Sequence, residues 1–139
     1  VELSANPDLN DGGFSFLAAN TAGYYLQTGT SAGRTWGTVP GGVAAPDTSV
    51  LTAQFDRALS TAMESSLRTN GGAAVAVPVA QNGTALGNFG NHPLYIGRRG
   101  GSSAPFNGHL YQLVVRGALT ADLAPIEAFT ADKTGVVLP

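Results

Sequence analysis

The amino-acid sequence contains no cysteine, so disulfide bonds, thiolate catalysis and zinc sites built on cysteine are all excluded. Charge is also scarce, because Asp, Glu, Lys and Arg make up 12% of the residues, where about a quarter is usual. Seven Lys and Arg residues and a formal net charge of -2 leave no dense basic surface, so we expect no nucleic acid partner. Apolar runs such as residues 73–80 are much shorter than the ~20 residues of a spanning helix, so we expect no membrane insertion.

Glycine, by contrast, is abundant, with 19 copies. A chain of 139 residues is long enough for one hydrophobic core and too short for two independent ones, so we expect a single domain over residues 1–139. The chain begins at Val1, with neither an initiator Met nor a signal-peptide pattern. We therefore interpret it as the C-terminal part of a longer protein.

Short segments of alternating apolar and polar residues recur between clusters of Gly, Asn, Pro and Asp, which is typical of antiparallel strands joined by tight turns. The sequence Asn70-Gly71-Gly72 supplies the positive φ angles of a hairpin turn. We expect Tyr95, Phe106 and Tyr111 to fill the core between two sheets. The predicted strands are residues 13–19, 24–28, 34–39, 50–56, 63–69, 73–79, 94–96 and 106–115, with a further strand-like run at residues 1–5.

One helix is predicted near the end of the chain. It begins at Asp122, which leaves Pro125 in the first turn, where its missing N–H costs nothing. It ends at Gly135, which can adopt the left-handed cap conformation. The residues expected to form its buried stripe are Leu119, Leu123, Ile126 and Phe129. Many strands and one terminal helix predict an all-β fold, an antiparallel two-sheet sandwich with a short C-terminal helix.

Two segments in the last third of the chain carry a family pattern. Residues 92–99 read HPLYIGRR, and after a short Gly/Ser loop residues 105–116 read PFNGHLYQLVVR. Together they strongly resemble the closing strands of concanavalin A-like, laminin G-like domains, with LYIG followed by F-x-G-x-(I/L)-Y-x-L. Residues 119–135, which end in KTG, are similar to the short helix of the versions of this domain found in tailed bacteriophages and prophages.

The resemblance implies a concanavalin A-like jelly roll and, through its phage members, a location on the virion surface or outside the cell. It also implies a lectin-like role in a tail fibre, tail or head-surface protein, with a cell-surface glycan, other virion proteins or copies of the same chain as partners. An alternative stays open, in which the domain is purely structural and decorates or cements a phage assembly through protein contacts.

Some relatives of this fold are glycoside hydrolases, which need two carboxylates ~5 Å apart or somewhat more. No predicted strand carries two of the nine acids at positions i and i+2 or i+4, and the family's E-x-D-x-x-E signature is absent. We therefore predict no enzymatic activity and no catalytic residue. Asp8, Asn10 and Asp11 form the densest oxygen cluster, for which either a calcium site or an Asx turn is a reasonable reading. We favour the turn, and we predict no metal and no cofactor.

Four residues are the candidates for ligand binding. Trp36 and Tyr25 offer aromatic faces that can stack on a sugar ring, although either ring can equally belong to the core. Because side chains alternate along a strand, Tyr24 and Tyr25 must point to opposite faces. Arg98 and Arg99 can grip a carboxylate or sulfate with their planar guanidinium groups, or simply end a strand in solvent.

Overall fold

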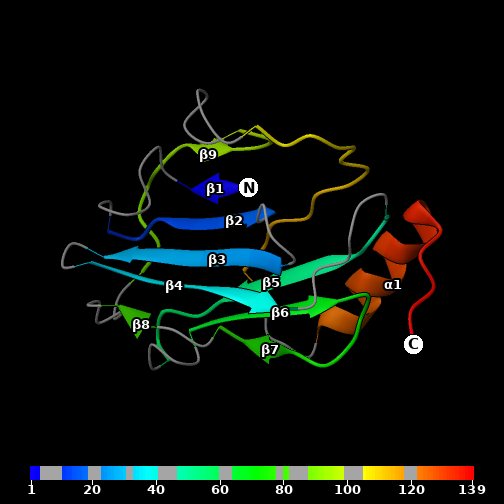
Figure 1. The fold of residues 1–139 in the computed structure, drawn as a ribbon, viewed down its shortest axis with the longest axis horizontal. Coiled ribbons are helices and arrows are strands. Elements are labelled where there is room, and N and C mark those ends of the chain that lie inside the picture. The colour runs from blue at the N-terminus through cyan, green and yellow to red at the C-terminus, as the bar shows by residue number, and fades with distance from the viewer. Residues whose placement is uncertain are drawn as a thin grey trace.

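Two antiparallel sheets and one C-terminal helix make up the described part of the chain, as Figure 1 shows. This computed structural model describes residues 1–3, 11–18, 23–30, 33–40, 47–59, 64–77, 80–81, 88–98, 105–117 and 122–139. The prediction of a chain built mainly from antiparallel strands, with a short helix at the end, is therefore confirmed.

The larger sheet has six strands in the order β8-β4-β3-β2-β1-β9. Its longest pairing is the β3–β4 hairpin, in which eight residues of each strand are paired. Alternation sets the two faces, so Phe16 on β2 contacts the core while Ser15 points to the other face. The strands are β1 (Glu2–Leu3), β2 (Phe14–Ala18), β3 (Gly23–Thr30), β4 (Gly33–Pro40), β8 (Ala80–Gln81) and β9 (Leu94–Tyr95).

The smaller sheet has three strands, β5 (Leu51–Phe55), β6 (Ser65–Thr69) and β7 (Val75–Ala76), in that order. The turn after β6 contains Asn70 with φ 51° and Gly71 with φ 74°, so the predicted hairpin turn is confirmed. The Asn70 side chain accepts a hydrogen bond of 2.8 Å from the Val50 N–H and so ties this turn to the start of β5. The predicted strand 73–79 is shorter than expected, because only β7 forms within its described residues.

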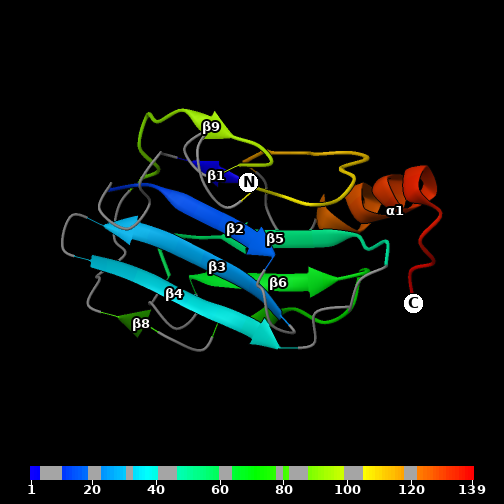
Figure 2. The ribbon, with the colours of Figure 1, turned by 45° about the horizontal axis from the view of Figure 1, so that its top comes forward.

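The two sheets share one hydrophobic core. Figure 2 shows β2, β3 and β4 in front of β5 and β6. Leu26 and Val39 from the larger sheet pack with Leu67 and Val77 from the smaller sheet and its edge. The partly buried side chains packed around these four residues are Phe16, Tyr24, Leu51, Ala53 and Phe55. The faces of the sheets therefore meet through residues from the first 77 positions.

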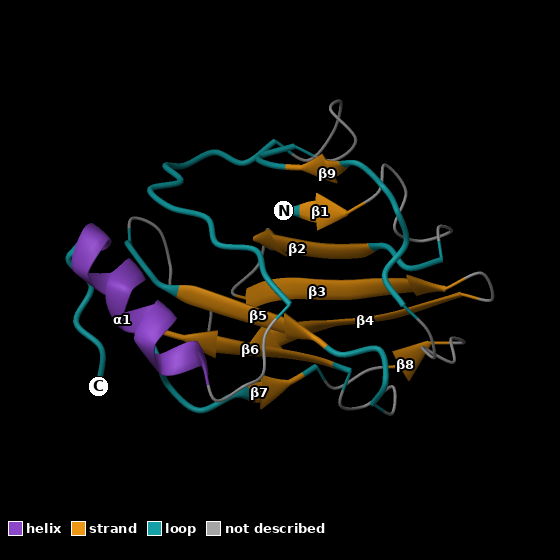
Figure 3. Cartoon of the chain, turned by 180° about the vertical axis from the view of Figure 1, so that it is seen from behind, coloured by secondary structure: helices purple, strands orange, loops and turns teal. Residues whose placement is uncertain are grey.

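Helix α1 (Leu123–Thr134) lies at one end of the smaller sheet, as Figure 3 shows from behind. Asp122 precedes it and Gly135 ends it with φ 71°, as predicted. The predicted buried stripe is wrong at Phe129, which is 52% exposed, because the helix buries Glu127 and Ala131 instead. Leu119 lies outside the described residues.

The predicted strand 106–115 is wrong, because residues 105–117 form no strand in this structure. Phe106 and Tyr111 are 50% and 65% exposed, and Tyr95 is half-buried on β9. The prediction that these three rings fill the core is therefore also wrong. Gly97, with φ 76°, turns the chain away after the two residues of β9, and the alternating segment beyond it has no neighbouring strand among the described residues. Alternation identifies a segment able to form a strand, but it does not supply the partner.

Candidate binding site

The candidate binding site lies on the face of the six-stranded sheet that points away from the core. Residues directly opposite each other in an antiparallel sheet point to the same face. Tyr25 on β3 lies opposite Thr38 on β4, and Gln27 lies opposite Trp36. Because Leu26 belongs to the core, the side chains on either side of it in β3 point the other way. Tyr25, Gln27, Trp36 and Thr38 therefore share the outer face.

The rings of Tyr25 and Trp36, here called the aromatic pair, lie side by side. Their centroids are 5.7 Å apart and their planes are inclined by 30°. The Tyr25 hydroxyl donates a hydrogen bond of 2.7 Å to the side-chain oxygen of Gln27. Gln27 is only 1% exposed, whereas both rings are half-buried and Thr38 is exposed. A buried amide thus fixes one ring of the pair, and the indole nitrogen of Trp36 is itself buried.

A row of polar side chains continues from the aromatic pair across the same face. The strand register places Ser15 opposite Gln27, and Glu2 opposite both Ser15 and Tyr95. Ser15 and Glu2 are at most 1% exposed. Burial lowers the pKa of the Val1 α-amino group, and the negative charge of the neighbouring Glu2 opposes that shift. The outer face therefore carries a hydroxyl and a carboxylate beneath its surface.

Sequence reasoning selected the two aromatic residues of this site and missed Gln27, Ser15 and Glu2. Alternation within β3 does place Gln27 on the same face as Tyr25. The alignment with Ser15 and Glu2 depends on the register between strands, and a one-residue slip would send each side chain to the opposite face. Only the paired structure shows the row.

The structure does not bring the candidate arginines to the aromatic pair. Arg98 is exposed and follows β9, which forms one edge of the larger sheet. Trp36 lies on β4, four strand spacings away, a distance of roughly 19 Å across the sheet. Arg99 lies outside the described residues. The four predicted ligand-binding residues therefore do not form one site around the aromatic pair.

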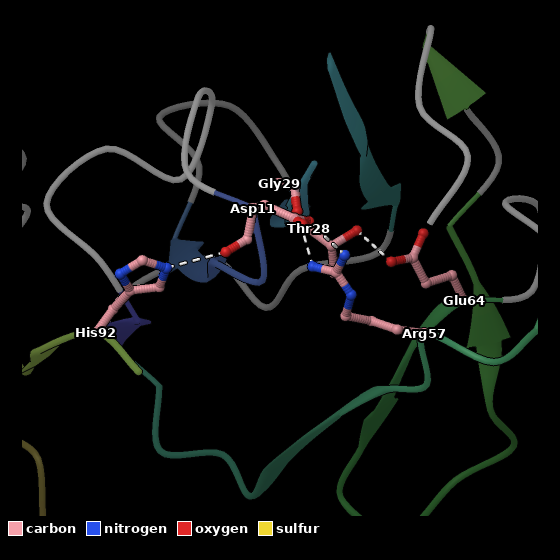
Figure 4. Close-up of polar contacts among 6 residues, drawn as sticks. All are labelled: Asp11, Thr28, Gly29, Arg57, Glu64 and His92. Atoms are coloured by element: carbon pink, nitrogen blue, oxygen red, sulfur yellow. Dashed lines mark hydrogen bonds and ion pairs between the residues drawn. The ribbon is translucent and has the colours of Figure 1, made fainter. Parts of the chain in front are cut away.

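A second polar group, here called the Arg57 cluster, joins the ends of the two sheets (Figure 4). The Arg57 side chain is 2% exposed and donates hydrogen bonds of 2.7 Å to the Gly29 carbonyl and 2.8 Å to the Asp11 carboxylate. His92 Nε2 lies 2.9 Å from the Asp11 carbonyl oxygen. The cluster thus links the turn before β2, the end of β3, the turn after β5 and the segment before β9.

The Arg57 cluster bears on the predicted choice between a calcium site and a turn. Asp11 is part of a turn, and its carboxylate is engaged by the positive charge of Arg57. A guanidinium group beside a carboxylate disfavours a second cation at that position. Asp8 and Asn10, the other two residues of the predicted oxygen cluster, lie outside the described residues.

Two carboxylates line a cavity of about 230 Å³ between β5, β6 and β7. Both make contacts within the protein: Asp56 accepts a hydrogen bond of 3.0 Å from the Ala58 N–H, and Glu64 accepts one from the Thr28 hydroxyl. The cavity surface is mainly apolar. Its lining residues are Gln54, Asp56, Leu59, Glu64, Ser66, Ala74 and Ala76.

Within the described ranges, no three His, Asp or Glu residues gather closely enough to hold a metal ion. The same part of the chain contains no helix with the length and apolar character needed to cross a bilayer. No family model, curated protein or solved structure matches this chain.

Proposed function

We propose that this chain is a non-catalytic carbohydrate- or receptor-binding module of a virion surface protein, with the aromatic pair as its contact surface. The observation that carries the proposal is the pair itself, two half-buried aromatic residues with ring centroids 5.7 Å apart on the face of the six-stranded sheet that points away from the core. Aromatic faces offer an apolar platform for the C–H groups of a sugar ring. The exposed Thr38 beside them adds a hydroxyl that can both donate and accept hydrogen bonds.

The pre-organised position of the Tyr25 ring also supports ligand binding at the aromatic pair. The Tyr25 hydroxyl is already bonded to Gln27, so this ring loses little conformational freedom when a ligand binds. A ligand that stacks on the pair would meet a surface already in its binding conformation.

The proposal includes a concanavalin A-like jelly roll. It is supported by the two antiparallel sheets that share a core and by the resemblance in sequence of residues 92–99 and 105–116 to laminin G-like domains, whereas residues 105–117 form no strand in this structure. The location on a virion, in a tail fibre, tail or head-surface protein, depends on the resemblance alone.

The non-catalytic part of the proposal is supported by the distribution of acids. Glycoside hydrolysis needs two carboxylates on either side of the bond. Among the described strand residues that share the outer face by register, Glu2 is the one carboxylate, and it is buried. The acids lining the cavity, Asp56 and Glu64, both accept hydrogen bonds from neighbouring residues.

A purely structural role, in which the domain decorates or cements a phage assembly, is the second candidate. One observation favours it: several large apolar side chains in residues 105–117 are exposed, and such surfaces often mark protein contacts.

Binding to an array of bacterial surface glycans tests the first proposal. We expect at least one glycan to be bound by the parent chain, and we expect Trp36→Ala to weaken that binding about tenfold or more, which corresponds to 1.4 kcal/mol. Tyr25→Phe keeps the ring but removes the bond to Gln27, so we expect a smaller loss. Phe129→Ala is the matched control, because it removes an exposed ring on α1, away from the sheet face.

Each result decides between the candidates. Equal binding by the parent chain and Trp36→Ala would exclude the aromatic pair as the contact. A silent array combined with tight binding to a purified virion protein would support the structural role. Release of reducing ends from a bound polysaccharide would overturn both proposals.

A further inference from the structure

The dipeptide Asn-Gly occurs three times in the chain, at residues 70–71, 82–83 and 107–108. This dipeptide is chemically reactive, because the backbone nitrogen of the glycine can attack the side-chain amide of the asparagine, and glycine has no Cβ to obstruct the approach. Residues 82–83 lie outside the described ranges. The other two copies have very different surroundings.

Asn70 is held through both its side chain and its backbone. The side-chain oxygen accepts a hydrogen bond of 2.8 Å from the Val50 N–H, and the Asn70 N–H donates one of 2.7 Å to the Val50 carbonyl. The Gly71 carbonyl accepts a further bond of 2.8 Å from the Arg68 side chain. The Asn70 side chain must therefore leave its bond to Val50 before its amide carbon can reach the Gly71 nitrogen.

Asn107 lies in a stretch without such restraints. In Figure 1 residues 105–117 are the yellow-to-orange trace between β9 and α1, outside both sheets. Asn107 and Gly108 are both exposed, and within the described part of the chain no hydrogen bond holds the Asn107 side chain or the Gly108 N–H. The nearest backbone bond joins the Phe106 N–H to the Gly97 carbonyl at 2.8 Å. The Asn107 side chain is therefore free to turn toward the Gly108 nitrogen.

We propose that Asn107 is a site of spontaneous deamidation in the folded chain, whereas Asn70 is protected by its hydrogen bonds. The Gly108 nitrogen forms a bond to Asn107 Cγ, the Cγ–Nδ2 bond breaks, and ammonia leaves with the proton that the Gly108 nitrogen gives up. Water then opens the resulting succinimide ring at one of its two carbonyls. Opening at Cγ gives aspartate, and opening at the backbone carbonyl gives isoaspartate, in which the main chain is longer by one methylene.

Either product places a carboxylate in a stretch that otherwise contains no acid. Residues 105–115 include neither Asp, Glu, Lys nor Arg, and the new group adds one negative charge to a formal net charge of -2. None of the described strands pairs with this stretch, so the longer main chain of isoaspartate interrupts none of their ladders. We therefore expect the modified chain to keep its fold. The inference involves neither Tyr25 nor Trp36 and stands apart from the proposed glycan site.

Mass spectrometry of peptides tests the proposal. The intact 139-residue chain is incubated near neutral pH in heavy-oxygen water and then digested in ordinary water, so that only modification of the intact chain leaves heavy oxygen in the new carboxyl group. We expect the label at residue 107, and we expect Asn70 to react roughly tenfold more slowly or less, because its hydrogen bonds must break first. The rate at Asn107 should rise with pH, since the deprotonated Gly108 nitrogen is the attacking group.

Unfolding in urea supplies a matched control within the same chain. Once the hairpin turn opens, both dipeptides present the same reacting groups without their native hydrogen bonds, so we expect Asn70 to react within a few-fold of the rate at Asn107. Asn107→Gln is the variant control. It keeps an exposed amide but lengthens the side chain by one methylene, so the succinimide ring cannot form, and we expect no label at residue 107.

Two results would overturn the inference. The first is a native chain in which Asn107 stays unlabelled over a time that labels the same residue in the urea-unfolded chain. The second is a native chain in which Asn70 gains label as fast as Asn107.

Discussion

At the level of single residues, the fold depends on a close approach of two backbones near the Arg57 cluster. The Gly12 N–H donates to the Gly29 carbonyl, and the Gly12 carbonyl accepts from the Gly90 N–H, each at 3.1 Å. Gly12 has φ 78°, and a Cβ added to it would lie 2.1 Å from the Gly90 nitrogen. A Cβ on Gly90 would lie 2.7 Å from the Asp11 carbonyl oxygen, a backbone atom, and 2.4 Å from His92 Nε2. Both positions therefore require glycine, for different steric reasons.

Gly12→Ala tests this contact. The methyl group would force the two segments apart and leave alanine at a positive φ, so we expect the free energy of unfolding to fall by about 2 kcal/mol or more. Urea unfolding followed by tryptophan fluorescence measures the change. Gly117→Ala is the matched control, because nothing lies within 4 Å of a Cβ there, and a change within about 0.5 kcal/mol is expected. A Gly12→Ala protein as stable as its parent would show that the backbones of Gly12 and Gly90 leave room for a methyl group.

At the level of elements, an ion pair joins helix α1 to the smaller sheet. The Glu127 carboxylate is 2% exposed and lies 3.0 Å from the Arg68 guanidinium on β6. Its second oxygen, Oε1, has no hydrogen-bond partner within the described residues. Breaking such a pair from one side leaves a buried charge without compensation, which is strongly destabilising. This contact also explains why the buried face of α1 includes Glu127 and leaves Phe129 exposed.

Arg68→Met tests the attachment of α1. Because Glu127 would remain buried without its partner, we expect a loss of about 3 kcal/mol in the free energy of unfolding and faster amide exchange along the helix. Adding Glu127→Leu to Arg68→Met should restore part of that stability, since an apolar pair needs no compensation. Asp132→Asn, at an exposed position on the same helix, serves as the control. Unchanged amide exchange in Arg68→Met would rule out a role for the ion pair in attaching α1.

The sequence predicted well those elements whose residue pattern matches the strand pairing or the helix bounds found in the structure. Strands 24–28 and 34–39 lie within β3 and β4, and the caps at Asp122 and Gly135 gave the helix bounds. The alternation of residues 106–115 is equally clear, yet none of the described strands pairs with this segment, so its pairing could not be read from the pattern. The site followed the same rule: Tyr25 and Trp36 were identified as aromatic residues, but their contact depends on strand register.

At the level of the whole molecule, stability depends on a small core that both sheets share. Leu26 and Val39 come from the larger sheet, and they meet Leu67 and Val77 on the other side. Neither sheet buries this surface alone, because each supplies only one half of it. The sheets should therefore unfold together, in keeping with the prediction of a single domain over residues 1–139.

Leu67→Ala separates this view from one in which each sheet is stable by itself. Leu67 is 1% exposed, so its truncation leaves a cavity between the sheets, and we expect a loss of about 2–5 kcal/mol in the free energy of unfolding. The shift should appear in one transition, with equal midpoints by near-ultraviolet and far-ultraviolet circular dichroism. Val137→Ala, at an 88% exposed position, should leave the midpoint unchanged. Two separate transitions, of which Leu67→Ala moves only one, would mean that the sheets are independent units and that the shared core does not unite them.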